Sequence, residues 1–381
     1  MNRVDQYLAD KLNQRRLDGN LRQLTTHKAR VDLFSNDYLG LATNNILAEV
    51  HSSASLPFYN YTGSTGSRLL SGNTAQVEAL EHTIATFHDA EAALVFNSGY
   101  DANTGLLASI ASRDTVILSD ELCHASLIDG IRLSQCTRKY KFAHNDMDDL
   151  EEKLQKYSAA HPVIVVAESI YSMDGDMAPL QVMAQLCEEH NARLIVDEAH
   201  ATGVAGTHGE GLVYALGLQQ QVFARIHTFG KAMGCHGAAV AGSELLKQYL
   251  VNFARSFIYT TALPGHTISC VQNAYSYLAD INFTNQPLHE LITYFRQQIQ
   301  ATGGNGWKDS YSPIQALIAG SNALAKKYAT ALQGVGLQVK PILHPTVPQG
   351  MERLRICLHT FNTRTEIDTL FAILNTTGLQ K

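Results

Sequence analysis

The chain has 381 residues, of which 45% are hydrophobic and 17% are charged, and its formal net charge is −6 at pH 7. This length allows two domains, or one large domain with a smaller appendage, and the composition is typical of an ordinary globular protein. The acidic balance argues against a nucleic-acid binder, and no apolar run approaches the length of a membrane span.

Residues 1–24 form a charged, amphipathic helix pattern that lacks the apolar core of a signal peptide. Further along, short apolar runs alternate with helical patterns. Runs rich in β-branched and small apolar residues predict buried strands at 92–99, 115–120, 162–169, 193–200, 225–230 and 238–243. Apolar residues at helical spacing predict helices at 75–87, 147–157 and 178–191.

The C-terminal part follows a different pattern. Residues 336–361 predict strand, loop and strand, and Thr363 with Glu366 forms a T-x-x-E capping box that opens a final helix at 366–375. This pattern is typical of an α+β appendage. We therefore expect a helix and N-terminal segment at 1–44, a large domain at 45–275 and a small C-terminal domain at 276–381.

Six cysteines are scattered along the chain with no Cys-x-x-Cys pair and no metal-like histidine spacing: Cys123, Cys136, Cys187, Cys235, Cys270 and Cys357. We expect reduced, mostly structural thiols in a cytoplasmic protein, and no metal site. Neither a nucleic acid nor a membrane is expected as a partner.

Strands that alternate with helices imply an α/β fold with a mostly parallel central sheet sandwiched by helices. In such folds the ligand lies beyond the carboxyl ends of the strands, so polar residues there are candidate site residues. Asp197 and His200 end one predicted strand, and His124 and Ser172 follow two others. Each also has a structural alternative, such as a buried salt bridge for Asp197 or a turn for Ser172.

Lys231 follows the predicted strand at 225–230 and lies among glycines and small residues in TFGKAMGCHGAAV. Taken alone, a lysine on a glycine-rich turn is most often a surface residue. In FNSGYDANTG, however, Ser98 and Gly99 precede a predicted helix, whose N-terminal N–H groups suit a phosphate. A lysine for a Schiff base, an acid opposite a pyridinium nitrogen and a phosphate cradle together match what pyridoxal 5′-phosphate (PLP) requires.

Five motifs occur in this order along the chain: FSNDYLGLA, HASLIDG, ESIYSMDGDMAPL, VDEAHATGVAGTHGEG and TFGKAMGCHGAAV. They resemble the α-oxoamine synthases, a family of PLP enzymes of the aspartate-aminotransferase fold (fold type I). The resemblance covers nearly the whole chain. It implies an acyltransferase that condenses an amino acid with an acyl thioester, in a homodimer with active sites at the subunit interface.

The resemblance implies catalytic roles at four positions. Lys231 would bind the cofactor as a Schiff base and move the α-proton, and Asp197 would pair with the pyridine nitrogen. His200 would hydrogen-bond the phenolic oxygen, and His124 would stack on the ring. Further cofactor contacts are implied at Ser98, Gly99, Tyr100, Ser172 and Thr228.

The resemblance also implies substrate and subunit contacts. Arg355 would hold the substrate carboxylate, for which its planar fork is suited, and Asn36 would lie near the same site. Thr346 and Arg22 would line the acyl-chain site. Thr260 and Thr261 would reach the phosphate of the neighbouring subunit.

Two features point to different branches of this family. The residues Cys235, His236, Gly237 and Ala238 resemble the branch that condenses L-alanine with pimeloyl-CoA or pimeloyl-acyl carrier protein. That reaction gives 8-amino-7-oxononanoate, CO₂ and free thiol in biotin biosynthesis. Arg68, in GSTGSRLLSG, is instead typical of branches that use glycine. We give the first feature more weight because it borders the lysine.

Several alternatives remain open. A 2-amino-3-ketobutyrate CoA ligase, which uses glycine and acetyl-CoA, and a serine palmitoyltransferase-like enzyme differ from this prediction in their amino acid. A transaminase fits less well, because the motifs are specific to condensation. A non-catalytic subunit of the family would lack Lys231, which this chain has.

Overall fold

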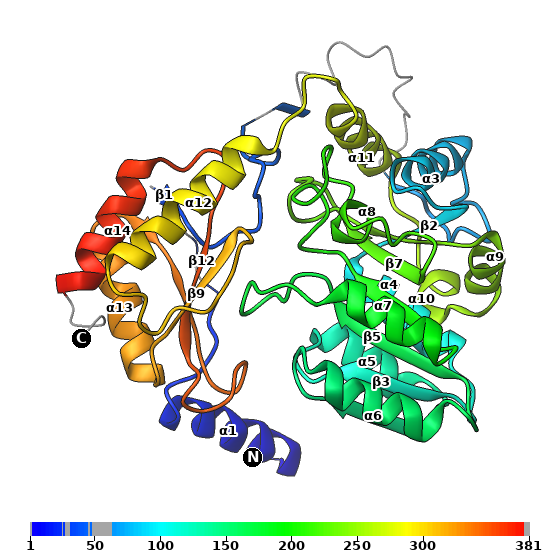
Figure 1. Ribbon diagram of the computed structural model, residues 1–381, viewed down its shortest axis with the longest axis horizontal. Helices are drawn as coiled ribbons and strands as arrows, with labels where there is room; N and C mark the ends of the chain where they lie inside the picture. Colours follow the sequence, from blue (N-terminus) through cyan, green and yellow to red (C-terminus); the bar gives the residue numbers. More distant parts are fainter. Residues whose placement is uncertain (1, 25, 27–30, 45, 48–62, 377–381) are drawn as a thin grey trace. The chain divides into compact units, whose positions relative to one another are not determined.

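The computed structural model describes residues 2–24, 26, 31–44, 46–47 and 63–376. They form two compact units, whose elements are labelled in Figure 1. The first unit comprises the N-terminal residues up to Ser35, the segment Met173–Asp176 and the residues from Pro287 onward. The second unit comprises Asn36–Ser172 and Met177–Gln286. Within the described ranges, no helix is both long enough and apolar enough to cross a membrane.

The second unit is built around a seven-stranded sheet with the order β2-β8-β7-β6-β5-β3-β4. Its strands are β2 (Ala92–Phe96), β3 (Val116–Asp120), β4 (Arg138–Phe142), β5 (Val163–Glu168), β6 (Arg193–Asp197), β7 (Val222–Thr228) and β8 (Ala238–Gly242). Neighbouring strands from β7 to β4 pair in parallel, whereas β8 pairs antiparallel with β7 and β2. The turn from β7 to β8 therefore lies at the edge where the parallel strands end.

Helices cover both faces of this sheet, as Figure 1 shows. The helices of this unit are α3 (Ala75–Phe87), α4 (Gly99–Ile110), α5 (Ala125–Leu133), α6 (Met147–Tyr157), α7 (Leu180–Glu189), α8 (Leu212–Ala215), α9 (Glu244–Phe253), α10 (Arg255–Ile258) and α11 (Gly265–Leu278). Successive residues of β5 enter opposite cores: Val165 clusters with Leu150 of α6, and Ile164 clusters with Leu107 of α4. Burial on both faces explains why the strands are continuous apolar runs.

The predicted fold class is confirmed, and each of the six predicted strands is present. Strand β7 begins at Val222, three residues earlier than predicted. Strand β4 was not predicted from the sequence, because its residues RKYKF are mostly polar and its middle is exposed at the sheet edge. The helices predicted at 75–87 and 147–157 match α3 and α6.

The first unit is α+β, as predicted. Its elements are α1 (Arg3–Leu17), β1 (Val31–Asp32), α12 (Gln286–Ala301), β9 (Ile314–Ile318), α13 (Asn322–Gly334), β10 (Leu337–Gln338), β11 (Lys340–Ile342), β12 (Arg353–Cys357) and α14 (Arg364–Thr376). Strands β11, β12 and β9 form an antiparallel sheet, and β1 pairs in parallel with β10. The capping box is confirmed, because Thr363 N–H donates to Glu366 Oε2 (2.8 Å) and Glu366 N–H donates to Thr363 Oγ1 (3.3 Å).

The two units group residues by proximity in space. The sequence instead predicts three parts that fold separately, namely 1–44, 45–275 and 276–381. That division stays a prediction, which expression of 45–275 alone would test.

Candidate active site

The edge where the parallel strands of the second unit end carries most of the predicted cofactor residues. Ser98 follows β2, His124 follows β3, and Ser172 follows β5. Asp197 is the last residue of β6, and Thr228 is the last residue of β7. The alternation of strands and helices therefore predicts correctly that these positions share one edge of the sheet.

Lys231 lies in the turn between β7 and β8 and is half-buried. Its Nζ is 2.9 Å from His200 Nε2, and His200 Nδ1 is 2.7 Å from the Tyr38 hydroxyl. The Tyr38 hydroxyl also donates to Asn36 Oδ1 (3.1 Å). Three predicted site residues, Lys231, His200 and Asn36, are thus joined through a buried tyrosine that the sequence did not single out.

The glycines around Lys231 allow close backbone packing. Gly234 has a φ of +62°, and a Cβ there would lie 2.4 Å from the backbone nitrogen of Ala42. A Cβ on Gly203, whose φ is +82°, would lie 2.7 Å from Ala232 Cβ. Both positions need glycine, because the turn that holds Lys231 rests directly on neighbouring backbone and side chain.

Asp197 is buried, and its carboxylate is held from two sides. Oδ1 accepts the N–H of Ala199 (2.9 Å), and Oδ2 accepts Nδ2 of Asn103 (2.8 Å). The Asn103 Nδ2 also donates to Ser126 Oγ (2.9 Å), which lies 2.7 Å from His124 Nδ1. The structure therefore links Asp197 to His124 through two residues that were missed in the sequence.

His124 is the N-terminal cap of α5, and its side chain accepts the N–H of Ser126. Loss of hydration lowers the pKa of His124, and the nearby Lys231 acts in the same direction, while the Asp197 charge opposes both. A lowered pKa keeps this imidazole neutral near pH 7.

Glu168 is a second buried acid at this edge, and it lies beside Asp197 in the β5–β6 register. It accepts the N–H of His124 (2.6 Å) and that of Ser172. Burial, reinforced by the Asp197 charge, raises the pKa of Glu168 to about 8. Glu168 therefore holds a proton at pH 7. Its place at a strand end, like that of Asp197, was a signal that could have found it.

The start of helix α4 forms a small cradle. Ser98 caps the helix and accepts the N–H of Asp101 (3.1 Å). The N–H groups of Gly99 and Tyr100 have no hydrogen-bond partner among the residues that the structure describes. A Cβ on Gly99 would lie 2.5 Å from Thr228 Oγ1, so glycine keeps this space open. The exposed Tyr100 donates its hydroxyl to Asp129 (2.7 Å), on α5.

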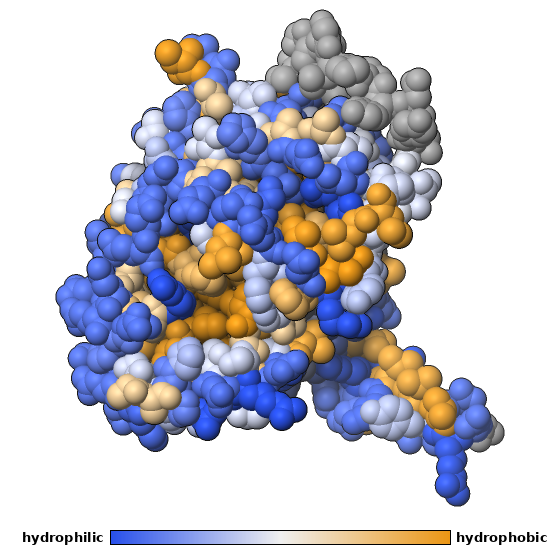
Figure 2. All heavy atoms as spheres, turned by 90° about the vertical axis from the view of Figure 1, so that its right-hand side faces the viewer, coloured by the Kyte–Doolittle hydropathy of each residue, from blue (hydrophilic) through white to orange (hydrophobic). Residues whose placement is uncertain are grey.

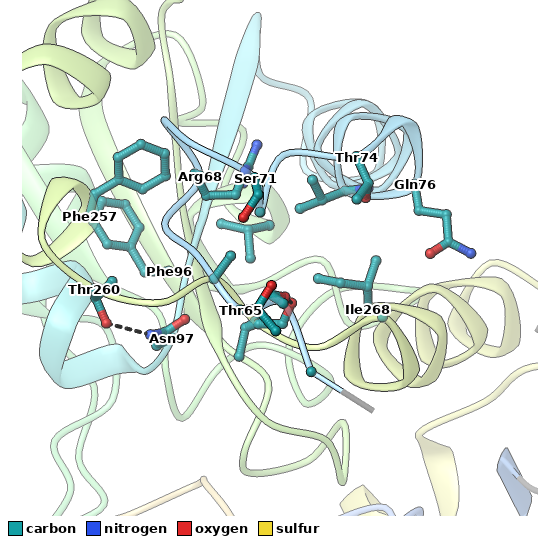
Figure 3. Close-up of a pocket in the computed structure, with 18 of the residues that line it drawn as sticks. Thr65, Arg68, Ser71, Thr74, Gln76, Phe96, Asn97, Phe257, Thr260 and Ile268 are labelled. Carbon is teal, nitrogen blue, oxygen red and sulfur yellow. Dashed lines mark hydrogen bonds between the residues drawn. The ribbon is translucent and has the colours of Figure 1, made fainter. Parts of the chain in front are cut away.

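A cavity of about 320 Å³ lies next to Asn97, the residue before Ser98 (Figure 3). Asn97 Nδ2 donates to Thr260 Oγ1 (2.9 Å) and to the carbonyl of Thr261 (2.8 Å). Both predicted threonines thus lie near the end of β2 in the same chain. Their contact with the phosphate of a neighbouring subunit stays a prediction.

Arg68 also lines this cavity (Figure 3), and its charge is already paired. Its NH1 lies 2.8 Å from Oε1 of the buried Glu81, and its Nε donates to Asn73 Oδ1 (2.8 Å). The guanidinium lies over the ring of Phe257, at 5.5 Å from the centroid. Lys247 Nζ is a second cation on Glu81, at 3.0 Å.

The predicted substrate residues Arg22, Thr346 and Arg355 belong to the first unit. Arg22 NH2 donates to Thr346 Oγ1 (3.2 Å), so two residues assigned to the acyl-chain site are in contact. Arg355 lies on the central strand β12, is buried, and its NH1 lies 3.0 Å from Cys357 Sγ. Their roles toward substrate remain predictions.

Comparison with known proteins first defines the class. A family model described as aminotransferase class I and II matches residues 28–373. An 8-amino-7-oxononanoate synthase from Emericella nidulans is 40% identical over 378 residues, covering 91% of this chain and 89% of the relative. Within its class, the chain belongs to the 8-amino-7-oxononanoate synthase family, whose members are α-oxoamine synthases.

Solved structures agree with the fold of this class. The 8-amino-7-oxononanoate synthase from Francisella tularensis is 27% identical with a TM-score of 0.75, over 91% of this chain and 97% of that chain. A structure of SPT with a PLP internal aldimine is 25% identical with a TM-score of 0.88, over 100% of both chains.

The residues at the sheet edge of this chain fit PLP. Lys231 supplies a primary amine, and Asp197 supplies a buried carboxylate held by two N–H donors. The cradle at Gly99 has open N–H groups and a space that a Cβ would fill. Within the described part of the chain, no group of three or more His, Cys, Asp or Glu side chains is arranged to hold a metal ion.

Proposed function

We propose that this protein is a PLP-dependent acyltransferase that condenses L-alanine with a pimeloyl thioester. The products are 8-amino-7-oxononanoate, CO₂ and free thiol, in biotin biosynthesis. The 40% identity to an 8-amino-7-oxononanoate synthase supports this reaction. The single structural observation that carries it is the 2.9 Å contact between Lys231 Nζ and His200 Nε2, at the same sheet edge as Asp197.

Bound PLP supplies an electron sink for the negative charge that develops at the α-carbon of the amino acid. Lys231 would hold the cofactor and carry the α-proton on Nζ. Asp197 would pair with the ring nitrogen and keep it protonated, and His200 would hydrogen-bond the phenolic oxygen. The neutral His124 would cover the ring face. The cradle at Gly99, with Ser98, Tyr100, Ser172 and Thr228, would hold the cofactor.

The substrate residues complete the proposal. Arg355 would bind the carboxylate of alanine through its planar guanidinium, with Asn36 near the same group. Arg22 and Thr346, which already share a hydrogen bond, would line the acyl-chain site. Binding energy from the acyl chain would then be used to position the thioester for attack.

We further propose a cytoplasmic homodimer, with Thr260 and Thr261 completing the partner's phosphate site. Large apolar side chains of this region are exposed, among them Leu245, Phe253 and Tyr259. Figure 2 shows apolar patches on the face of the second unit that α3 and α9 form in Figure 1. Apolar patches of this kind are typical of interaction surfaces.

The experiment that tests the function is thiol release by the PLP-loaded protein. Alanine, glycine and serine are each combined with pimeloyl-CoA, pimeloyl-acyl carrier protein and acetyl-CoA. Release with alanine and a pimeloyl donor is the expected result, and the better donor identifies the carrier. Release with glycine and acetyl-CoA alone would overturn the biotin assignment while keeping the class of reaction.

A serine palmitoyltransferase-like reaction is the second candidate. The observation that favours it is the TM-score of 0.88 to the SPT structure, which is higher than the 0.75 to the Francisella tularensis synthase. The serine arm of the assay, extended with palmitoyl-CoA, separates this reaction from the first.

A further inference from the structure

Asn103 is a buried residue of α4 to which neither the strand ends nor the motifs assign a role. It is 2% exposed, and with Ser126 it forms the chain of contacts that runs from Asp197 to His124. Of its side-chain atoms, only the amide nitrogen has partners, whereas the buried Oδ1 has none among the described residues. A buried carbonyl without a partner is unfavourable. The favourable contribution of the Asn103 side chain therefore comes from its donor nitrogen.

The donors in this chain of contacts can be assigned one by one. Both Nδ2 hydrogens of Asn103 are used, one on Asp197 Oδ2 and one on Ser126 Oγ. The Ser126 backbone N–H points to His124 Nδ1, so that nitrogen carries a lone pair. The Ser126 hydroxyl therefore donates to the same atom, and the hydrogen of the neutral imidazole lies on Nε2.

Helix packing fixes the position of the amide. A Cβ on Gly130 of α5 would lie 2.8 Å from the backbone carbonyl oxygen of Asn103 and 3.0 Å from Leu107 Cβ. Glycine thus lets α5 lie directly against α4, with Asn103 facing the start of α5, where His124 and Ser126 are. The distance between the amide and Ser126 Oγ, one of its two acceptors, is therefore set by the contact of two helices.

We propose that Asn103 is a positioning residue that fixes the Asp197 carboxylate and the His124 imidazole relative to each other. The two groups would contact the cofactor ring from different directions, the first at the ring nitrogen and the second at the ring face. One amide therefore sets the geometry of both contacts. This inference rests on the proposed function, because it assigns those two groups to PLP.

The test compares Asn103→Leu with a matched control, Asn285→Leu. Asn285 is also buried, and its Nδ2 donates to two carbonyls, those of Val204 (2.9 Å) and Gly206 (3.0 Å). Both variants lose a buried amide with two hydrogen bonds, but only the first loses a link to Asp197. The measurements are the PLP dissociation constant, the pH titration of the visible absorbance of the PLP-loaded protein, and the thermal midpoint.

We expect Asn103→Leu to raise the PLP dissociation constant by about 10-fold. The absorbance midpoint reports the proton on the Schiff-base nitrogen. It should rise by about half a pH unit, because a ring nitrogen with a poorly held counter-ion carries less positive charge and withdraws fewer electrons from that nitrogen. Asn285→Leu should lower the thermal midpoint to a similar extent and change neither cofactor property. An unchanged dissociation constant and midpoint in Asn103→Leu would overturn the proposal.

Two further variants keep the test decisive. Asn103→Ser is too short to reach Asp197 but stays polar, so it replaces Asn103→Leu if that variant does not fold. Ser126→Ala removes the hydroxyl that joins Asn103 to His124 but keeps the bond from Asn103 to Asp197, so it should leave the absorbance midpoint unchanged. None of these measurements needs substrate. A cofactor effect without thiol release from any pair would therefore refute the proposed function and leave the positioning role intact.

Discussion

Lys231 Nζ and His200 Nε2 lie 2.9 Å apart, at the turn that joins β7 to the reversed strand β8. The amine is therefore held by an imidazole, within a turn whose backbone is fixed by its own close packing. The backbone conformation of the turn therefore does not depend on the lysine side chain.

Lys231→Ala should lower thiol release by about 10³-fold or more, because the amine that would hold the cofactor and carry the α-proton is removed. The thermal midpoint without PLP should stay close to that of the unaltered protein, since the glycine contacts of the turn remain. The thiol assay and thermal unfolding provide the two measurements, and Lys153→Ala on α6 is the control. Retained thiol release in Lys231→Ala would show that another group does the chemistry.

Gly99→Ala should weaken PLP binding by about 10-fold without loss of stability. The added Cβ would lie 2.5 Å from Thr228 Oγ1 and fill the cradle, while alanine suits the first turn of a helix. Fluorescence titration with PLP measures the effect. Thr228→Ala removes the clashing oxygen, so the double variant should lose less affinity than the sum of the two single changes. Strict additivity would contradict this contact.

Arg68→His should destabilise the protein by about 2 kcal/mol and leave the ratio of pimeloyl to acetyl transfer unchanged. The reason is that Arg68 is occupied by Glu81, which would keep only Lys247 as a cation. Denaturant unfolding and the thiol assay test the two halves separately. A shift of the acyl ratio toward pimeloyl would instead make Arg68 a determinant of the branch.

Glu198→Gln should flatten the pH dependence of stability. Burial raises the pKa of Glu198 from 4.5 to about 7, so this carboxyl is neutral in the folded state and ionised in the unfolded chain above pH 4.5. Its contribution to stability is therefore complete below pH 4.5 and is lost as the pH rises toward 7.

The variant has no such group, so its free energy of unfolding relative to the unaltered protein should increase between pH 5 and 8, on the order of 1–3 kcal/mol. Denaturant unfolding at several pH values measures this difference. The pKa of the buried His88 is lowered to about 3, and its opposite pH dependence is common to both proteins and cancels. A constant difference across this range would show that Glu198 is ionised in the fold.

The strands and the shared edge could be predicted because burial on both faces leaves continuous apolar runs that end in polar residues. Strand β4 has no such run, since it is exposed at the edge. The direction of β8 leaves no trace in its composition, because a buried strand is apolar in either direction. The residue pattern therefore predicts which segments are strands better than it predicts the direction of each strand.

The positions missed in the site depend on tertiary contacts. Asn103 lies in a helix interior, and its role exists only because α5 lies against α4. Arg22 and Thr346 are 324 positions apart, so no local pattern could indicate their hydrogen bond, and the resemblance alone assigned both to one site. Glu168 had the same strand-end signal as Asp197 but lay outside the positions that the resemblance assigned.

The pairing of β1 with β10 has a consequence for the order of folding during synthesis. Val31 pairs with Leu337, about 300 positions later in the chain, whereas the second unit is complete at Gln286. Synthesis proceeds at about 5–20 residues per second, so β10 is made on the order of 15–60 s after β1. Strand β1, although it is made early, is thus among the last strands that can pair. The seven-stranded sheet has time to fold before this pairing.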